Sequence, residues 1–331
     1  MIDVKLTTPA PAWPWARQTP GGSGQWGPFR FQIDQSVERC DAWIVYEGND
    51  QEHTCLCPPE RTIFISGEPD SVGHYPAAYL AQFGLVVSSR LDLQHPNIVR
   101  MQQGQPWFVE QSYDDLLVMA PPFKTRDICL ITSDKTFTSG HQQRLEFVEQ
   151  LKQHLGDRLD IFGRGIRDFD RKWDILAPYR FTIVLENYCG DDFITEKMPD
   201  AWLAYCYPFY AGCTNLGRYI QEGSYEELDM SDVPGSVKKL LQVVNDSTKE
   251  AVRREHLVHA RRYYLEQMQC FSLMGQLLQQ QLGQPASAPC AVTIRPRSAF
   301  TEVPQRASLA QICRSTLRRQ LVKLFKNKEP R

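Results

Sequence analysis

The sequence lacks long apolar runs, paired-cysteine motifs and a strong excess of either charge. No run approaches the roughly 20 residues that a helix needs to cross a bilayer, and the opening residues, MIDVKLTTPAPAW, lack the basic-then-apolar order of a signal peptide. The ten cysteines are scattered without a CxxC pair, which favours reduced, buried thiols over a disulfide framework or a metal site. The net charge of −2 gives no general attraction to nucleic acid. We therefore expect a cytoplasmic protein without nucleic-acid partners.

The 331 residues suffice for two domains, and the apolar segments form two similar series. The β-branched runs DAWIVYEG, RTIFISGE and FGLVVSS predict a small α/β domain with largely parallel strands. From Asp127 the pattern predicts a strand (DICLITSD), an amphipathic helix (HQQRLEFVEQLKQHLG) that Gly156 ends, strands at LDIFGR and RFTIVLEN, a helix over roughly residues 196–205 and a strand at YPFYAG. This alternation predicts two doubly wound domains facing a cleft.

The remaining segments set the expected boundaries. The Pro- and Gly-rich stretch PAPAWPWARQTPGGSGQWGPF predicts a loop or docking segment, and residues 106–122 are typical of a linker. The pattern over residues 248–281 predicts a long helix that closes the second domain. We therefore predict an acceptor-side domain at residues 1–120, a ligand-binding domain at residues 121–284, and a linker with a tail at residues 285–331.

The tail has a basic amphipathic pattern over residues 309–328. Its apolar residues fall on one helical stripe, and arginines and lysines occupy much of the rest. Such a helix suits an anionic membrane surface, which would make the protein peripheral on the inner face of a membrane. It suits equally well a helix packed on the body of the protein with its basic face in solvent.

Polar residues separate two apolar segments in LENYCGDDFITEKMPDAW, residues 185–202. The preceding strand would deliver Glu186 and Asn187 to the edge of the sheet where ligands of parallel sheets bind. The next helix begins near Thr195, and a helix N-terminus with Lys197 in its first turn suits a phosphate. Glu196 can accept hydrogen bonds from vicinal hydroxyls such as those of ribose. The pattern fits a nucleoside diphosphate, or a helix that Thr195 and Glu196 merely cap.

The run from Leu185 to Gly212 resembles the signature of family 10 fucosyltransferases, which has F-E-N, a short loop, Y-[IV]-T-E-K and a strand ending in Gly. Upstream, QRLEFVEQL, LDIFGRG and YRFTIVLEN resemble, in the same order, the family's Arg-containing helix, its D-V-[FY]-G-[RK] strand and the strand that leads into F-E-N. In the first half, IFISGEPDSV resembles a strand ending in a Glu that family members place in the cleft. The resemblance covers residues 127–213 strongly and residues 61–100 moderately.

The resemblance implies a GT-B architecture, in which two Rossmann-like domains face a cleft and the C-terminal one holds most of a GDP-sugar. It implies Glu196 as the acceptor of ribose hydroxyl groups, and Lys197 with Arg144 as the pair that neutralises the departing diphosphate. Asn187, Thr195 and Phe193 are implied to line the same pocket.

On the opposite side of the cleft, the resemblance implies Glu68 as the general base of a one-step inverting reaction. Without the resemblance, Glu68 would be a surface carboxylate in a strand-to-loop turn. The family carries no dedicated metal site, and the adjacent Asp191 and Asp192 lack a third ligand, so we expect no metal and no cofactor.

The leading hypothesis is a fucosyltransferase that moves fucose from GDP-fucose to a hydroxyl group of a glycan, such as a surface polysaccharide, a lipopolysaccharide or a glycolipid. Two departures from the family pattern motivate alternatives: Phe193 replaces a usual Tyr, and Tyr205 stands where Gly is common. We expect both near the sugar end of the pocket. The alternatives are a transferase of another GDP-sugar and a catalytically silent glycan- or nucleotide-binding protein of the same fold.

Overall fold

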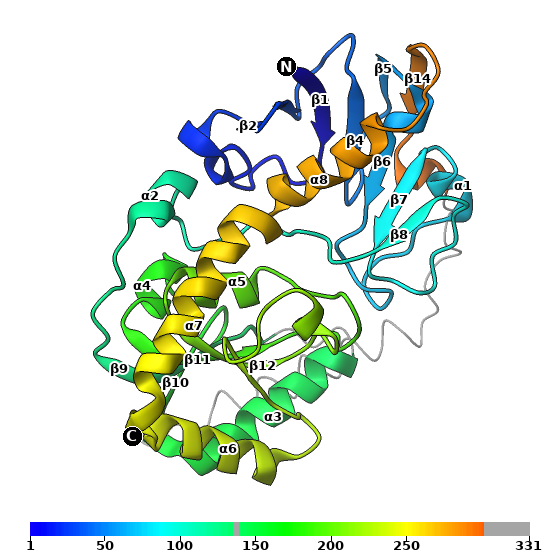
Figure 1. Cartoon of the computed structure of the whole chain (residues 1–331). Helices are drawn as coiled ribbons and strands as arrows, with labels where there is room; N and C mark the ends of the chain where they lie inside the picture. Colours follow the sequence, from blue (N-terminus) through cyan, green and yellow to red (C-terminus); the bar gives the residue numbers. More distant parts are fainter. Residues whose placement is uncertain (135–138, 301–331) are drawn as a thin grey trace, which may run out of the picture.

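A computed structural model describes residues 1–134 and 139–300, which form two α/β domains (Figure 1). The first domain contains a seven-stranded sheet with the order β2-β3-β1-β4-β6-β7-β8, parallel except for the pair β2–β3. Its strands are β1 (Ile2–Thr7), β2 (Gln25–Trp26), β3 (Phe29–Ile33), β4 (Ala42–Tyr46), β6 (Thr62–Ile65), β7 (Leu85–Ser88) and β8 (Ile98–Arg100). All side chains of β4 and β6 are buried, because the sheet is covered on both faces.

Strand β1 differs from the sequence-based expectation, which placed no strand ahead of residue 41. Ile2–Thr7 pairs in parallel with both β3 and β4 and therefore lies inside the sheet. Lys5 interrupts the apolar pattern that would predict a buried strand, because it is a charged residue at a position that is only 3% exposed. Its ammonium group lies 4.4 Å from the centroid of the Trp43 ring, a cation–π contact that offsets part of the cost of burial.

The second domain is an all-parallel, five-stranded sheet with the order β10-β9-β11-β12-β13. Its strands are β9 (Arg126–Ile131), β10 (Leu159–Phe162), β11 (Tyr179–Leu185), β12 (Tyr207–Ala211) and β13 (Glu226–Glu227). Its principal helices are α3 (Ser139–Leu155), α4 (Lys172–Leu176), α5 (Lys197–Leu203), α6 (Val233–Asn245) and α7 (Glu250–Tyr263). These elements confirm the alternation predicted from Asp127 onward, and Gly156 follows α3 with a φ of 53°.

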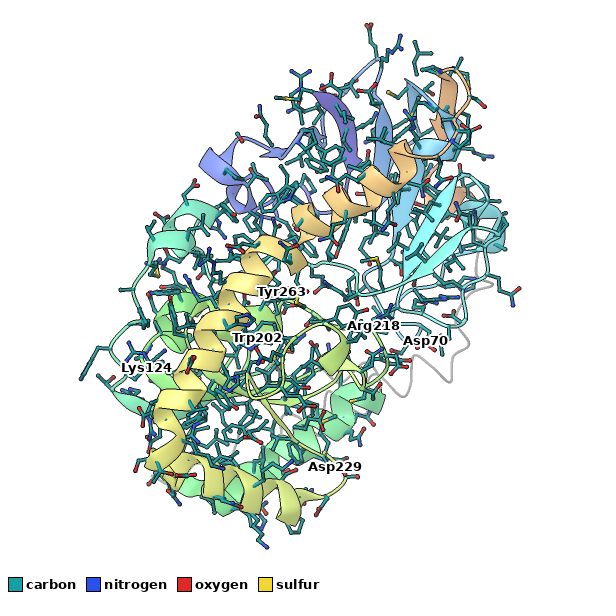
Figure 2. All side chains as sticks on the ribbon, viewed as in Figure 1. Asp70, Lys124, Trp202, Arg218, Asp229 and Tyr263 are labelled. Atoms are coloured by element: carbon teal, nitrogen blue, oxygen red, sulfur yellow. The ribbon has the colours of Figure 1, made fainter. Side chains whose placement is uncertain are left out.

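Helices cover the second sheet on different sides. Helix α3 packs against α6, whereas α5 packs against β11, β12 and α7 (Figure 1). Trp202 of α5 is fully buried (Figure 2), and its ring centroid lies 6.4 Å from that of Tyr264, which directly follows α7. This packing fixes α5, whose first turn carries the polar residues of the predicted site.

After α7 the chain crosses back to the first domain. A π-helical turn (Tyr264–Met268) and a break at Gln269 lead into α8 (Cys270–Leu282), which lies along the first sheet (Figure 1). Phe271, Met274 and Leu278 of α8 belong to the hydrophobic core of the first domain. The single helix predicted over residues 248–281 is therefore two helices, and the second of them completes the first domain instead of closing the second one.

The region predicted as linker and tail, residues 285–331, contains a strand. Strand β14 (Cys290–Ile294) pairs antiparallel with β5 (His53–Cys57) of the first domain. Residues 301–331 lie outside the described residues, and with them the predicted amphipathic helix over residues 309–328. Among the described residues, none of the helices combines the length and apolar character needed to cross a membrane.

Candidate functional site

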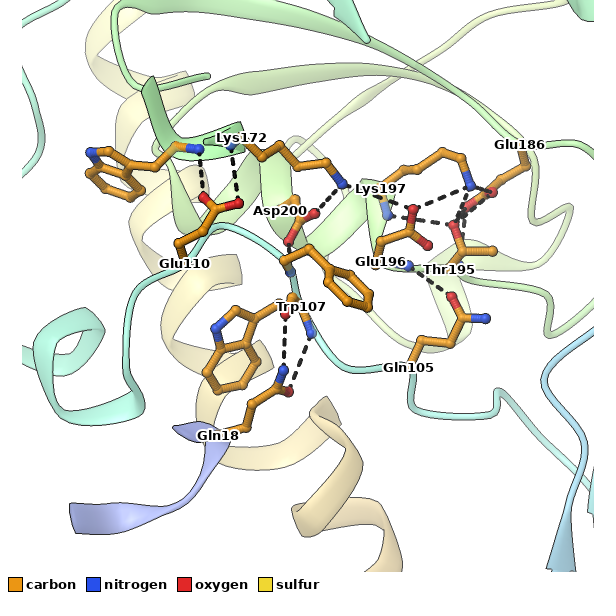
Figure 3. A network of polar contacts seen from close by, with 12 residues as sticks. Gln18, Gln105, Trp107, Glu110, Lys172, Glu186, Thr195, Glu196, Lys197 and Asp200 are labelled. Atoms are coloured by element: carbon orange, nitrogen blue, oxygen red, sulfur yellow. Dashed lines mark hydrogen bonds and ion pairs between the residues drawn. The ribbon is translucent and has the colours of Figure 1, made fainter. Parts of the chain in front are cut away.

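A pocket of about 430 Å³ lies at the carboxyl ends of β9 and β11 in the second domain. This volume is in the range of small-molecule sites, and the carboxyl edge is where open parallel sheets bind ligands. Four of the predicted residues line the pocket, namely Arg144, Asn187, Glu196 and Lys197. Figure 3 shows the polar network on the α5 side of this pocket.

A second pocket of about 400 Å³ lies at the opposite edge of the same sheet. Arg180 and Phe181, near the start of β11, and Tyr207, the first residue of β12, contribute to its lining. The amino ends of parallel strands lack the crevice formed by the loops and helix N-termini of the carboxyl edge. We therefore assign the functional site to the pocket that contains Lys197.

Glu186 directly follows β11, and its fully buried carboxylate organises the start of α5. The backbone N–H of Thr195 donates to Oε1 of Glu186 at 3.0 Å, and the Thr195 hydroxyl lies 2.8 Å from both carboxylate oxygens. Nζ of Lys197 lies 3.1 Å from Oε2 of Glu186 and 2.9 Å from the Thr195 hydroxyl. Thr195 therefore holds Glu186 and Lys197 together, and it is not among the residues that line the pocket.

Glu196 lies between two lysines at the pocket wall. Its Oε1 is 3.7 Å from Nζ of Lys197 and 3.9 Å from Nζ of Lys172. Burial alone would raise the pKa of Glu196, but the two ammonium groups lower it below its usual value. Burial alone would lower the pKa of Lys197, but Glu186 and Glu196 raise it above its usual value. The site therefore presents an ionised carboxylate beside a fully protonated ammonium group.

Lys172 and Asp200 are members of this network that the sequence did not reveal. Nζ of Lys172 lies 2.5 Å from Oδ2 of Asp200, which is 1% exposed. Burial raises the pKa of Asp200 to about 6, although Lys172 opposes the shift. Lys172 is the first residue of α4, in a stretch without a recognisable motif. Asp200 was detectable in principle, because it is an acid among apolar residues of a buried helix.

Arg144 of α3 forms the other cationic wall. It is 3% exposed; Nη1 donates to Oδ1 of Asn187, and Nη2 donates to the carbonyl oxygen of Ser133 at 3.0 Å. Burial lowers the pKa of Arg144, and Glu186 opposes this shift. Among the described residues, Nε of Arg144 and the buried hydroxyl of Thr132 have no hydrogen-bond partner. Both residues line the pocket, so unused hydrogen-bonding groups are available to a ligand there.

The two departures from the family pattern lie away from the pocket lining. Phe193 is 3% exposed and packs edge-to-face on Tyr188 with ring centroids 5.4 Å apart. Tyr205 lies at the other edge of the sheet, in the pocket beside Arg180. Its φ of 53° is in the left-handed region, which explains why a glycine would suit this position. The expectation that both lie at the sugar end of the pocket is therefore wrong for Tyr205, and Phe193 is core instead of lining.

The adjacent acids Asp191 and Asp192 have structural partners. Oδ1 of Asp192, which is 5% exposed, accepts hydrogen bonds from the side chains of Tyr219, Asn215 and Arg218 at 2.5, 2.9 and 3.2 Å. Within residues 1–134 and 139–300, His, Cys, Asp and Glu side chains form no group of three that could hold a metal ion.

Glu68 follows β6 in the first domain and is exposed, and it does not line the pocket. A connecting segment, residues 102–111, runs between the loop that carries Glu68 and the pocket. Nε2 of Gln103 lies 3.5 Å from the carbonyl oxygen of Gly67, next to Glu68. Two residues further on, Oε1 of Gln105 accepts the backbone N–H of Glu196 at 3.2 Å (Figure 3). The segment therefore contacts both the loop of Glu68 and the wall of the pocket.

The same connecting segment also contacts Asp200 and Lys172 of the polar network. The backbone N–H of Phe108 donates to Oδ1 of Asp200 at 2.8 Å. The carboxylate of Glu110 accepts the backbone N–H groups of Lys172 and Trp173, each at 3.1 Å, and so caps the start of α4 (Figure 3). The residues of the pocket wall are therefore in direct contact with the segment that connects the two domains.

Three comparisons place these observations beside known proteins. Residues 121–274 match the family model described as glycosyltransferase family 10 (fucosyltransferase), C-terminal domain. The 3-galactosyl-N-acetylglucosaminide 4-alpha-L-fucosyltransferase of Pan troglodytes is 24% identical over 190 residues, 55% of this chain and 48% of that protein. The chain thus spans about half the length of this curated relative. A crystal structure of an alpha1,3-fucosyltransferase with GDP-fucose matches with a TM-score of 0.52 and 13% identity, covering 87% of this chain and 92% of the other.

The two α/β domains and the fold of this solved structure define the fold class, which is GT-B. Within residues 121–274, the second domain is similar to the C-terminal domain of glycosyltransferase family 10. The matched residues include Arg144, Asn187, Glu196 and Lys197, the four predicted residues that line the pocket.

Proposed function

We propose that the protein transfers fucose from GDP-fucose to a hydroxyl group of a glycan or glycolipid, with inversion at the anomeric carbon. The observation that carries the proposal is the pocket in which Arg144 and Lys197 supply two cations beside the ionised Glu196. This arrangement suits a diphosphate joined to a ribose. The names of the family and of the matched proteins, which specify fucosyl transfer and GDP-fucose, support the choice of donor.

In the proposed step, the oxygen of the acceptor hydroxyl attacks C1 of fucose from the side opposite the diphosphate. The bond between C1 and the phosphate oxygen breaks, and its electron pair leaves with GDP. The hydroxyl proton passes to the carboxylate of Glu68. Negative charge grows on the leaving diphosphate, so fixed cations at Arg144 and Lys197 stabilise the transition state more than the ground state.

The neighbouring residues hold these groups in place. Asn187 accepts a hydrogen bond from Arg144, and Glu186 fixes the ammonium group of Lys197. Glu196 would accept the ribose hydroxyl groups. Since two protein cations already face the diphosphate, we expect turnover without a divalent metal. Equal rates before and after treatment with EDTA would support this, and restoration of a lost rate by Mg²⁺ or Mn²⁺ would contradict it.

The donor class can be tested by thermal unfolding with GDP, UDP, CMP and ADP at equal concentrations. We expect GDP to raise the melting temperature most, because a ligand stabilises the state that binds it. The absence of selective stabilisation by GDP would refute the donor assignment. Binding of GDP without transfer of fucose to any member of a β-galactoside and glycolipid acceptor panel would instead indicate a catalytically silent protein of the same fold.

The base can be tested separately with Glu68→Gln. This variant should keep the thermal shift with GDP and lose turnover by about 100-fold or more. Glu52→Gln, at an exposed carboxylate of the same domain, is the matched control and should keep the wild-type rate. A Glu68→Gln enzyme with the wild-type rate would remove Glu68 from the mechanism.

A further inference from the structure

Glu47 directly follows β4 and lies under the loop that carries Glu68. Its backbone has a φ of 65°, a left-handed conformation that residues other than glycine rarely adopt. Its backbone N–H donates to the carbonyl oxygen of Ile65, the last residue of β6, at 2.8 Å. The conformation turns the chain at the carboxyl edge of the first sheet, so Glu47 stands beside the loop that follows β6.

The carboxylate of Glu47 holds this loop at both ends. Oε1 accepts the backbone N–H of Gly67, and Oε2 accepts the hydroxyl of Tyr75 at 2.8 Å. The Glu68 backbone also donates to Glu47. A Cβ atom at Gly67 would lie 2.5 Å from Oε1 of Glu47, so a larger residue there would force the Glu47 carboxylate or the loop to move. The loop between Gly67 and Tyr75 is therefore closed over Glu47.

Other groups make this arrangement rigid. Tyr75 is 3% exposed and packs edge-to-face on Phe64 with ring centroids 5.0 Å apart. Arg90 donates to the carbonyl oxygen of Gly73 and lies over the Tyr75 ring. A loop fixed at Gly67, Gly73 and Tyr75 presents Glu68 in one position, although Glu68 itself is exposed.

We propose that Glu47 is a positioning residue for the proton-accepting carboxylate: it fastens the loop that carries Glu68, and its negative charge strengthens Glu68 as a base. The proposal rests on the proposed function, because it assumes that Glu68 accepts the proton. An ionised carboxylate close to another makes the second one hold a proton more tightly. The two carboxylates then titrate as a pair.

The charge of Glu47 changes near neutral pH. Burial raises its pKa to about 7; the hydroxyl of Tyr75 lowers it, and the charge of Glu68 raises it further. The titratable and charged groups around this carboxylate come from β4, the loop itself, the segment after β7 and the turn Arg297–Phe300: Tyr46, Glu68, Tyr75, Arg90 and Arg297.

The decisive experiment measures kcat/KM for the acceptor from pH 5 to pH 9 with the full-length protein, GDP-fucose and a glycan acceptor. Above about pH 7, where Glu47 is ionised, Glu47→Gln should lower kcat/KM about tenfold, and below about pH 6, where Glu47 of the wild type is protonated, the two proteins should approach each other. Glu52→Gln makes the same chemical change at an exposed site and should follow the wild-type profile throughout. A merely structural role would lower kcat/KM by the same factor at every pH. An unchanged profile for Glu47→Gln, or a rate lowered equally at every pH, would overturn the proposal.

A second measurement does not depend on turnover. Hydrogen exchange of the backbone in a peptide covering residues 66–75 should become faster in Glu47→Ala and stay as in wild type in Glu52→Ala. The thermal shift with GDP should remain in both variants and shows that they are folded. Unchanged exchange in a folded Glu47→Ala variant would overturn the proposal. If wild type transfers no fucose while exchange responds as expected, the proposed function fails and the role of Glu47 in holding the loop stands.

Discussion

Replacing Lys197 by methionine removes the ammonium group and keeps a side chain of similar length. In the protein, this group lies 3.1 Å from Oε2 of Glu186, which is fully buried. Removal of one partner of a buried ion pair costs about 3–5 kcal/mol, because the other charge stays buried without compensation. Lys197 is 24% exposed and Thr195 also contacts Glu186. We therefore expect the lower end, a loss of about 3 kcal/mol in the free energy of unfolding.

The same substitution removes one cation from the pocket. A hydrogen bond to a charged group contributes about 1.5–3 kcal/mol, so the affinity for GDP should fall by roughly 10- to 150-fold. The two effects can be separated in the double variant Glu186→Gln with Lys197→Met, which removes both charges. Its free energy of unfolding should return to within about 1 kcal/mol of wild type. Its affinity for GDP should remain as low as that of Lys197→Met.

Urea unfolding and titration calorimetry with GDP, at one pH and ionic strength, measure the two quantities. Lys238→Met, at an exposed position of α6, provides the control and should change neither. A Lys197→Met protein as stable as wild type would show that the pair with Glu186 does not support the fold. Wild-type GDP affinity in the double variant would show that Lys197 does not contact the diphosphate.

Three further predictions follow from the same geometry. Asp200 keeps its proton in the native state up to about pH 6, whereas the unfolded chain loses it near pH 4, so this group makes the free energy of unfolding fall as pH rises between these values. In Asp200→Asn, urea unfolding at pH 4, 6 and 8 should show that this decline is smaller by about 3 kcal/mol. An undiminished decline would contradict the raised pKa of Asp200. Arg144→Lys keeps the charge but loses the planar fork that contacts Asn187 and Ser133, so calorimetry should show GDP affinity lower by about tenfold. Gly67→Ala should lower kcat without changing the thermal shift with GDP, because the new methyl group forces apart the Glu47 carboxylate and the loop; a wild-type kcat would show that this contact does not matter.

The second domain was largely predictable because its local signals agree with one another. Strand β11 is largely apolar and buried from Phe181 to Leu185, as expected for a strand buried on both faces, and the polar residues after it fall at the carboxyl edge of the sheet. The order of strand, loop and helix was sufficient to predict that Asn187, Glu196 and Lys197 lie in one pocket. Arg144 could be assigned only through the family resemblance, since an arginine on an amphipathic helix has no distinctive local pattern.

The residues that escaped prediction depend on contacts between distant parts of the chain. Lys5 is tolerated inside a sheet because its ammonium group contacts the Trp43 ring, and the local sequence around Lys5 does not predict this contact. Lys172 joins the site only through the folding of α4 against α5. Glu47 becomes significant only when the loop after β6 closes onto it. Each of these depends on a tertiary neighbour that the local sequence does not contain.

The return of α8 and β14 to the first domain has a consequence for how the chain folds during synthesis. Phe271, Met274 and Leu278 fill the core beneath the first sheet, and β14 pairs with β5, so the first domain lacks essential parts until about 290 residues have been made. The second domain, continuous in sequence, can form while the chain is still growing, whereas the early strands must wait with apolar surface exposed. A fragment ending near residue 120 should therefore aggregate, and the usual order of folding, from the N-terminus onward, should be reversed in this protein.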